Sequence, residues 1–311
     1  MKVLITGGAG YLGSTLSQHL LEKGYKVTVF DNLLFNQLSL LHLFNNIDFQ
    51  FIKGDVRNTS ELLKLVSEHD VIIPLAAIVG MPACKANPDL TIDINFTQIY
   101  NIIKILSNNQ YLILPNTNSQ YGSSESIITE DSEFRPLSLY AKTKCDAENA
   151  LLENGNGISL RLATVFGVSP RMRTDLLVND FVYKSLNDGY LVLFEAKFKR
   201  NYIHVKDIAR TFEFMIQNYD KCKGEPFNVG LSSANLSKLE LAENIKKFIP
   251  DLVIKLDDFK EDFDKRNYIV SNEKLESKGW QPVYDLNYGI NQLINAYQII
   301  IHKNNKNFTN L

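Results

Sequence analysis

The sequence of 311 residues is poor in cysteine and in net charge. Its cysteines, Cys84, Cys145 and Cys222, stand too far apart for a disulfide framework or a set of metal ligands. We therefore expect free thiols in a reducing cytoplasm, and no metal site. Lysine plus arginine (33) nearly balances aspartate plus glutamate (35), which argues against nucleic acid or an anionic membrane as a partner.

Long apolar runs are absent as well. The longest, Val71–Cys84, is interrupted by Pro74 and Pro82 and is shorter than a membrane span. The apolar run at the start of the sequence is too short for a signal peptide and leads directly into glycines. We therefore expect no membrane partner. A chain of this length can form one large α/β domain, or a main domain with a smaller lobe.

The first half contains short β-branched runs that alternate with helical patterns. Because most of these runs are apolar throughout, they are typical of parallel strands covered by helices on both faces, which predicts a doubly wound α/β sheet of the Rossmann type. The predicted strands are Lys2–Thr6, Lys26–Phe30, Phe49–Ile52, Val71–Leu75, Tyr111–Leu114 and Ile158–Ala163. The predicted helices between them include Tyr11–Lys23, Thr91–Leu106 and Leu139–Glu153, the last with Ser138 as its N-cap.

Beyond Gly167 the alternation is looser. We interpret this part as a smaller C-terminal α/β lobe that lies over the carboxyl ends of the strands, where such sheets bind ligands. Its predicted elements are helix Leu176–Leu186, a strand near Leu191–Phe194, and helices Lys238–Phe248 and Tyr288–His302.

A glycine loop joins the first predicted strand to the first predicted helix. Gly7 permits a tight turn, Gly10 lets the backbone approach a pyrophosphate, and Gly13 allows close packing of helix and strand. Asp31 ends the second strand, where a carboxylate can accept hydrogen bonds from a ribose diol and would repel a ribose 2′-phosphate. Residues 32–35 offer no arginine for such a phosphate, so NAD is favoured over NADP. The alternative is a tight turn without a ligand.

Tyr140 and Lys144 lie four residues apart on one predicted helix, so their side chains share a face. A phenol has an ordinary pKa near ~10. An adjacent ammonium, together with the positive nicotinamide of oxidised NAD, would favour phenolate and lower that pKa, and Tyr140 could then take the proton of a hydroxyl as hydride leaves the carbon. Thr117, just after the fifth strand, supplies a hydroxyl at the same sheet edge. Taken alone, Tyr140 and Lys144 at this spacing are typical of a solvated helix face, and Thr117 is typical of a polar turn.

Together these motifs resemble the extended short-chain dehydrogenase/reductases that act on nucleotide sugars. The resemblance covers nearly the whole chain, including 54–56, 75–77, 160–167, 200–207, 227–230 and 279–282. It implies an NAD-binding Rossmann domain over residues 1–165, to which 200–230 partly return, and a nucleotide-sugar-binding lobe over 166–311. It also implies a cytoplasmic homodimer, joined through 91–106 and 139–153.

The resemblance assigns roles residue by residue. Asp55 and Val56 would contact adenine, and Arg200 and Arg266 would hold the pyrophosphate of the sugar nucleotide. The implied catalytic residues are Thr117, Tyr140 and Lys144. The implied cofactor-binding residues are Gly7, Gly10, Tyr11, Leu12, Gly13, Asp31, Asn32, Asp55, Val56, Leu75, Ala76, Ala77, Tyr140 and Lys144. The implied substrate-binding residues are Val79, Thr117, Thr164, Asn179, Arg200 and Arg266.

Departures from the family pattern narrow the chemistry. Sugar 4,6-dehydratases carry Asp-Glu directly after the position of Thr117, and Asn118-Ser119 stand here instead, which argues against elimination of water. Pro74 replaces a common histidine, and Thr164 a common substrate-contacting asparagine, so the sugar's orientation stays open.

The remaining alternatives concern the substrate and the outcome. Segments 115–119, 161–167, 169–173 and 176–181 resemble a narrower subgroup, dehydrogenases that oxidise C4 of GDP-D-glycero-α-D-manno-heptose in surface-polysaccharide synthesis, and UDP-glucose 4-epimerase is a looser match. The keto sugar could be released or reduced again as the epimer. A non-catalytic NAD sensor or scaffold is the alternative from another class.

Overall fold

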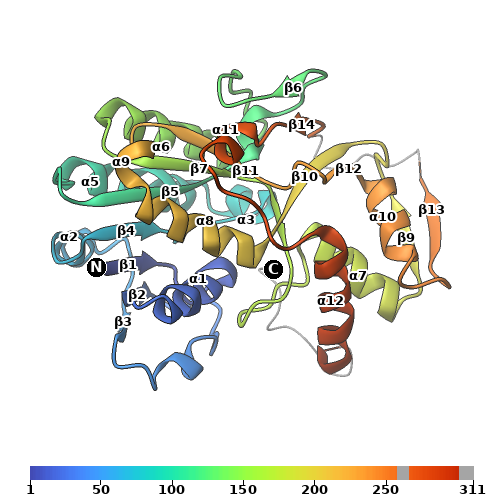
Figure 1. Cartoon of the computed structure of the whole chain (residues 1–311), viewed down its shortest axis with the longest axis horizontal. Helices are drawn as coiled ribbons and strands as arrows, with labels where there is room; N and C mark the ends of the chain where they lie inside the picture. The colour runs from blue at the N-terminus through green and yellow to red at the C-terminus, as the bar shows by residue number, and fades with distance from the viewer. Residues whose placement is uncertain (258–265, 301–311) are drawn as a thin grey trace.

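The computed structural model describes residues 1–257 and 266–300, and a seven-stranded parallel sheet forms its centre (Figure 1). The strand order is β11-β7-β5-β4-β1-β2-β3, so strands β2 and β3 are added on one side of β1 and the later strands on its other side. This order confirms the predicted doubly wound fold. The strands are β1 (Lys2–Thr6), β2 (Lys26–Asp31), β3 (Phe49–Lys53), β4 (Val71–Pro74), β5 (Tyr111–Thr117), β7 (Ile158–Leu162) and β11 (Pro226–Val229).

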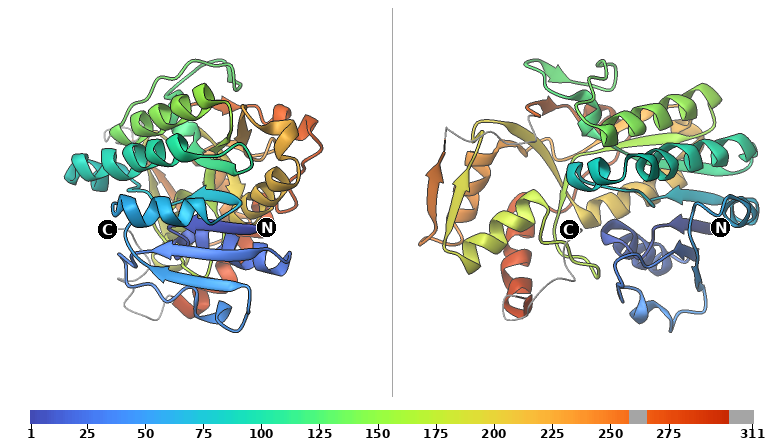
Figure 2. Two further views of the ribbon diagram at one scale, coloured as in Figure 1. Left: turned by 90° about the vertical axis from the view of Figure 1, so that its left-hand side faces the viewer. Right: turned by 180° about the vertical axis from the view of Figure 1, so that it is seen from behind.

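Helices cover both faces of this sheet (Figure 2). On one face α1 (Tyr11–Glu22) packs against α8 (Val205–Gln217), over strand residues such as Val3 and Ile5. The other face carries α2 (Thr59–Ser67), α5 (Gln98–Ile105) and α6 (Leu139–Asn154), over residues such as Leu4. Successive residues of a strand point to opposite faces, and Val3, Leu4 and Ile5 are all fully buried. A strand that is covered on both faces therefore requires an apolar run without alternation.

The helix predicted over Thr91–Leu106 is interrupted. It consists of α4 (Pro88–Ile92), a π-helical turn η2 (Asp93–Thr97) and α5. Asn95 lies in the π turn, and its buried amide accepts a hydrogen bond from the backbone N–H of Ile78 (2.9 Å) and donates to the Ile78 carbonyl (3.0 Å). The widened turn thus fastens the loop that follows β4, in keeping with the occurrence of π turns at functional sites.

Helix α6 follows its sequence signals closely. The Ser138 hydroxyl accepts a hydrogen bond from the Ala141 N–H (3.2 Å), and the helix ends at Gly155 in the left-handed conformation (φ 75°). The predicted Ser138 cap is therefore confirmed, and together with Gly155 it fixes the position of the helix that carries Tyr140 and Lys144.

Smaller layers lie beside the large sheet, and all of their strands except β6 come from the second half of the chain (Figure 1). Their strands are β8 (Thr164–Phe166), β10 (Lys199–His204) and β12 (Asn235–Ser237) in one sheet, β9 (Tyr190–Leu193) with β13 (Val253–Leu256) in a second, and β6 (Ile127–Ile128) with β14 (Ile269–Val270) in a third. The remaining helices are α3 (Met81–Ala86), α7 (Leu177–Asn187), α9 (Tyr219–Cys222), α10 (Lys238–Lys246), α11 (Glu273–Ser277), α12 (Leu286–Ile300) and the short turns η1 (Leu41–Leu43) and η3 (Asn118–Tyr121).

Two observations bear on the sequence predictions for this half. The helix predicted over Tyr288–His302 begins earlier, at Leu286, and residues 301 and 302 lie outside the described residues. Across 1–257 and 266–300, none of the helices has the length and apolar character that a membrane crossing needs.

Candidate active site

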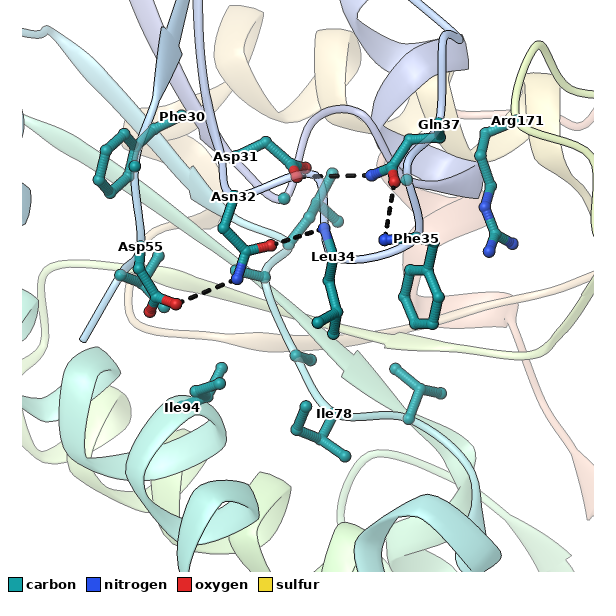
Figure 3. A pocket seen from close by; sticks show the side chains of 18 residues that line it. Phe30, Asp31, Asn32, Leu34, Phe35, Gln37, Asp55, Ile78, Ile94 and Arg171 are labelled. Atoms are coloured by element: carbon teal, nitrogen blue, oxygen red, sulfur yellow. Dashed lines mark hydrogen bonds between the residues drawn. The ribbon is translucent and has the colours of Figure 1, made fainter. Parts of the chain in front are cut away.

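An open pocket of about 790 Å³ lies at the carboxyl ends of β1, β2 and β4. Its walls come from the glycine loop, the segment after β2, residues 54–56 and the loop after β4 (Figure 3). The predicted cofactor and substrate residues that line it are Gly7, Gly10, Asp31, Asn32, Asp55, Val56, Leu75, Ala76, Ala77 and Val79. Within the described part of the chain, no group of three His, Cys, Asp or Glu side chains is placed to hold a metal ion.

The glycine loop has the shape that a dinucleotide requires. Gly7 has a positive φ of 69°, and a Cβ placed there would lie 2.6 Å from the Ala76 backbone nitrogen. A Cβ on Gly13 would lie 2.5 Å from the Gly8 Cα, so only glycine lets α1 approach the loop this closely. Helix α1 begins at Tyr11, followed by Leu12, and its N-terminal end is suited to a pyrophosphate.

Asp31 and Asp55 shape the adenosine side of the pocket. The buried Asp31 carboxylate accepts hydrogen bonds from the N–H groups of Ala9 (3.0 Å) and Leu33 (2.8 Å); burial raises the pKa of Asp31, and these bonds oppose the rise. Asn32 donates to Asp55 (3.0 Å; Figure 3). Arg57 holds Asp55 through two side-chain bonds, which keeps the pKa of that carboxyl well below its usual range. These residues fit the diol and base of NAD.

Lys144 and Tyr140 lie on α6 in a region of low solvent access. The Lys144 side chain, 4% exposed, donates from Nζ to the Pro115 carbonyl oxygen (2.9 Å), and burial lowers the pKa of Lys144 to about 8. Burial raises the pKa of Tyr140 to about 12, while the charges of Arg266 and Arg173 and a hydrogen bond with Thr117 lower it.

The electrostatics of Tyr140 differ from the sequence prediction. We expected the Lys144 ammonium to lower the pKa of the phenol, but burial outweighs every stabilising contact, and the cations named above are arginines rather than Lys144. The sequence could not indicate this, because it shows the spacing of Tyr140 and Lys144 but not how dry their surroundings are. In the chain alone, Tyr140 is a protonated phenol at neutral pH.

Thr117 is held in place by a buried polar network. Its hydroxyl accepts from the Ser119 N–H (3.1 Å) and donates to the Ser119 hydroxyl (2.9 Å). Its own N–H donates to Asn116 Oδ1 (3.0 Å), and the Asn116 amide donates to the Lys144 carbonyl (3.2 Å) and to Glu148 (2.8 Å). Asn116 therefore links the strand end that carries Thr117 to the helix that carries Tyr140 and Lys144.

The predicted substrate residues are spread over several elements. Arg266 donates to the Ser119 hydroxyl, so it lies beside Thr117, and Arg200 is buried on β10 with its guanidinium 5.6 Å from the Tyr268 ring. Thr164 begins β8 and pairs with β10. The Asn179 amide accepts from the Gly167 N–H (3.0 Å) and donates to the Arg173 carbonyl (2.7 Å), contacts that hold the loop before α7.

The prediction from sequence missed several residues that line the pocket, and Arg171 is the charged one among them; the others are Phe30, Leu34, Phe35, Gln37, Gly54, Ile78 and Ile94. Arg171, from the loop between β8 and α7, lines the dinucleotide pocket together with Gly10 and Phe35 (Figure 3). Residues 32–35 contain no arginine, as predicted, but the fold brings one to them from the second half of the chain. No local pattern in the sequence signals this approach.

Comparisons with known proteins agree with this geometry. A family model described as the NAD dependent epimerase/dehydratase family matches residues 3–230. UDP-glucuronic acid decarboxylase 1 of Arabidopsis thaliana is 27% identical over 96% of this chain and 70% of its own length, and Protein CapI of Staphylococcus aureus is 31% identical over 70% of each. The crystal structure of UDP-glucuronic acid 4-epimerase from Bacillus cereus, in complex with UDP-glucuronic acid and NAD, has a TM-score of 0.85 at 24% identity, covering 96% of this chain and 100% of that one.

Proposed function

The chain belongs to the NAD dependent epimerase/dehydratase family, and from that premise we propose that it reversibly oxidises C4 of a nucleotide-activated sugar. NAD is the cofactor of this family, in agreement with the prediction from Asp31. The observation that carries the proposal is the convergence of Thr117, Tyr140 and Lys144 at the edge of the sheet that also bears the dinucleotide pocket. We propose that residues 1–165, with part of 200–230, hold NAD, and that 166–311 hold the sugar nucleotide.

The chemistry assigns one task to each side chain. Thr117 orients the C4 hydroxyl, and the Tyr140 oxygen takes the hydroxyl proton as hydride leaves the carbon. Bound NAD would supply the acceptor for this hydride, and the donor in the reverse reaction. Lys144 binds the nicotinamide ribose, and the charges of Arg266 and Arg173 favour the phenolate that Tyr140 must reach from a raised pKa.

The residues after Thr117 support oxidation without elimination. Elimination needs an acid and a base beside C5 and C6, whereas Asn118 is an amide and the Ser119 hydroxyl already bonds Thr117 and Arg266. Arg266 and Arg200 are proposed to hold the pyrophosphate, with Val79, Thr164 and Asn179 nearer the sugar. The product is then a 4-keto sugar that is either released or reduced on its other face.

The substrate and the outcome form the finer part of the proposal. We favour a GDP-heptose-like sugar of surface-polysaccharide synthesis, with a UDP-sugar 4-epimerase as the alternative. The low-salt glycan biosynthesis protein Agl12 of Haloferax volcanii, 26% identical over 96% of this chain and 98% of its own length, supports a setting in glycan synthesis. We also propose a homodimer through α4–α5 and α6, because Ile92, Tyr100 and Ile105 leave large apolar side chains exposed on the first two helices.

A substrate panel tests the proposal. Purified protein with NAD is incubated with GDP, UDP, dTDP and CDP sugars, and chromatography with mass spectrometry separates ketone from epimer. We expect turnover of at least one sugar, and a loss of about 10²–10⁴-fold for Tyr140→Phe. Full activity of that variant would refute the role of Tyr140. Tight NAD binding without turnover on any sugar would favour the sensor or scaffold instead.

A further inference from the structure

Arg171 reaches the dinucleotide pocket from a part of the chain that the cofactor motifs do not include. Its side chain is 4% exposed, and it lines the same pocket as Gly7, Gly10 and Asp31. Figure 3 shows it beyond Gln37, on the opposite side from Asp31, with its guanidinium next to the Phe35 ring. The cation thus lies away from Asp55 and the adenosine side.

The backbone around Arg171 is fastened to the N-terminal end of α1. The Tyr11 hydroxyl donates to the Gly167 carbonyl (2.6 Å), and the Ser169 hydroxyl donates to the Tyr11 carbonyl (2.6 Å). The Arg171 N–H donates to the Ser14 hydroxyl (3.3 Å), one turn into the same helix. Because this end of α1 offers free N–H groups and a partial positive charge, Arg171 stands where an anion is already favoured.

The ring of Phe35 is the second group that limits the position of the Arg171 side chain. The Arg171 Cζ atom lies 4.9 Å from the centre of this ring, within the range of a cation–π contact. Phe35 belongs to the loop after β2, which is tied back to Asp31 through Gln37 (Figure 3). The guanidinium is therefore bracketed between two elements that line the pocket, and its direction is set in advance.

Charge decides which part of a dinucleotide Arg171 meets. A guanidinium remains protonated in proteins, so Arg171 presents a fixed positive charge to the pocket that it lines. The pyrophosphate supplies two negative charges, and its planar O–P–O edges match a guanidinium fork.

We propose that Arg171 is a cofactor-binding residue that contacts the pyrophosphate of NAD beside the N-terminal end of α1. The segment Gly167–Arg171 thereby makes the second half of the chain part of the cofactor site. Cofactor affinity then depends on how this segment sits on α1, and not on the first 165 residues alone.

Titration calorimetry on the cofactor-free full chain tests this, with NAD, ADP-ribose and adenosine as ligands. Arg171→Gln should weaken NAD and ADP-ribose by about 10–100-fold, the range expected when a charged hydrogen-bond partner is lost, and leave adenosine unchanged. Arg171→Lys, which keeps the charge but loses the fork, should lie between. Lys26→Gln removes the same charge from an exposed side chain at the start of β2 and should bind all three ligands like the parent.

Three outcomes would overturn the proposal. The first is that Arg171→Gln binds NAD within twofold of the parent. The second is that it loses affinity for adenosine as strongly as for NAD, which would indicate a general effect on the pocket. A selective loss of NADP affinity would place the guanidinium at the ribose 2′ position instead. Circular dichroism checks that each variant is folded, and if Arg171→Gln is not, the ratio of ADP-ribose to adenosine affinity in Arg171→Lys decides the question.

Discussion

Glu148→Gln is the perturbation whose cost the structure defines best. The Glu148 carboxylate is fully buried and accepts from Arg161 at Nε (2.9 Å) and Nη2 (2.5 Å), from the Asn116 amide (2.8 Å) and from the Ser159 hydroxyl (2.5 Å). All four contacts come from donors. A glutamine would point its NH₂ group, which is also a donor, at one or more of these donors. It would also leave Arg161, which is 3% exposed, without its counter-charge.

The magnitude follows from the burial of both partners. Removing one member of a buried ion pair costs about 3–5 kcal/mol. With an unfolding entropy of about 2.1 cal/mol/K per residue, a chain of this size loses about 5–8 °C in Tm for that cost. Because the same carboxylate holds Asn116, and Asn116 holds the Thr117 N–H, we also expect kcat to fall while the affinity for NAD is kept.

Differential scanning calorimetry measures the effect, and Glu153→Gln is the matched control because Glu153 lies exposed near the end of the same helix. The control should unfold at the parent temperature. A double variant, Glu148→Leu with Arg161→Met, should recover much of the lost stability, since it removes both charges together. If Glu148→Gln and Glu153→Gln unfold within a degree or so of each other, the ion pair does not stabilise the fold by the amount expected for a buried pair.

Three further predictions concern cofactor choice, pH and product. Asp31→Asn should narrow the preference for NAD over NADP by roughly tenfold or more, because it removes a like charge from the ribose 2′ position; the ratio of the two dissociation constants measures this, and an unchanged ratio would contradict it. Burial lowers the pKa of Lys144 from 10.5 to about 8, so the unfolded chain binds more protons between these values and this residue's contribution to stability rises with pH across that range. Denaturant unfolding of Lys144→Met should lack that part of the rise, and an identical slope in both proteins would count against the buried ammonium. Finally, mass spectrometry should detect no dehydrated sugar, because Asn118 and Ser119 replace the acid pair of the dehydratases.

The large sheet was predictable because its signals are local and redundant. Strand β1 is apolar at Val3, Leu4 and Ile5, and each of these side chains is fully buried on one face or the other. The boundaries of α6 were predictable for the same reason, since Ser138 and Gly155 act within a few residues of themselves. Predictions of this kind depend only on residues that are close to one another in the sequence.

Features that depend on distant contacts were missed or wrong. The π turn at Asp93–Thr97 exists because Asn95 bonds both backbone groups of Ile78, a contact between segments that periodicity alone cannot relate. The raised pKa of Tyr140 has the same origin, because it depends on how many elements close over α6. A sequence motif identifies the reactive group but not the dielectric around it.

Arg171 shows why the division into a cofactor half and a substrate half is only a first approximation. Apart from Tyr140 and Lys144, the predicted NAD-binding residues lie within the first 77 residues. The pocket wall nevertheless includes a guanidinium whose position depends on hydrogen bonds of Tyr11 and Ser14 with Gly167, Ser169 and the Arg171 backbone. These bonds join the helix that faces the pyrophosphate to the loop that leads into α7. Since α7 packs against α12, we expect a motion of that layer on substrate binding to reach the cofactor site through these hydrogen bonds. Substrate and cofactor affinities should therefore be coupled, and by linkage the coupling must be equal in both directions.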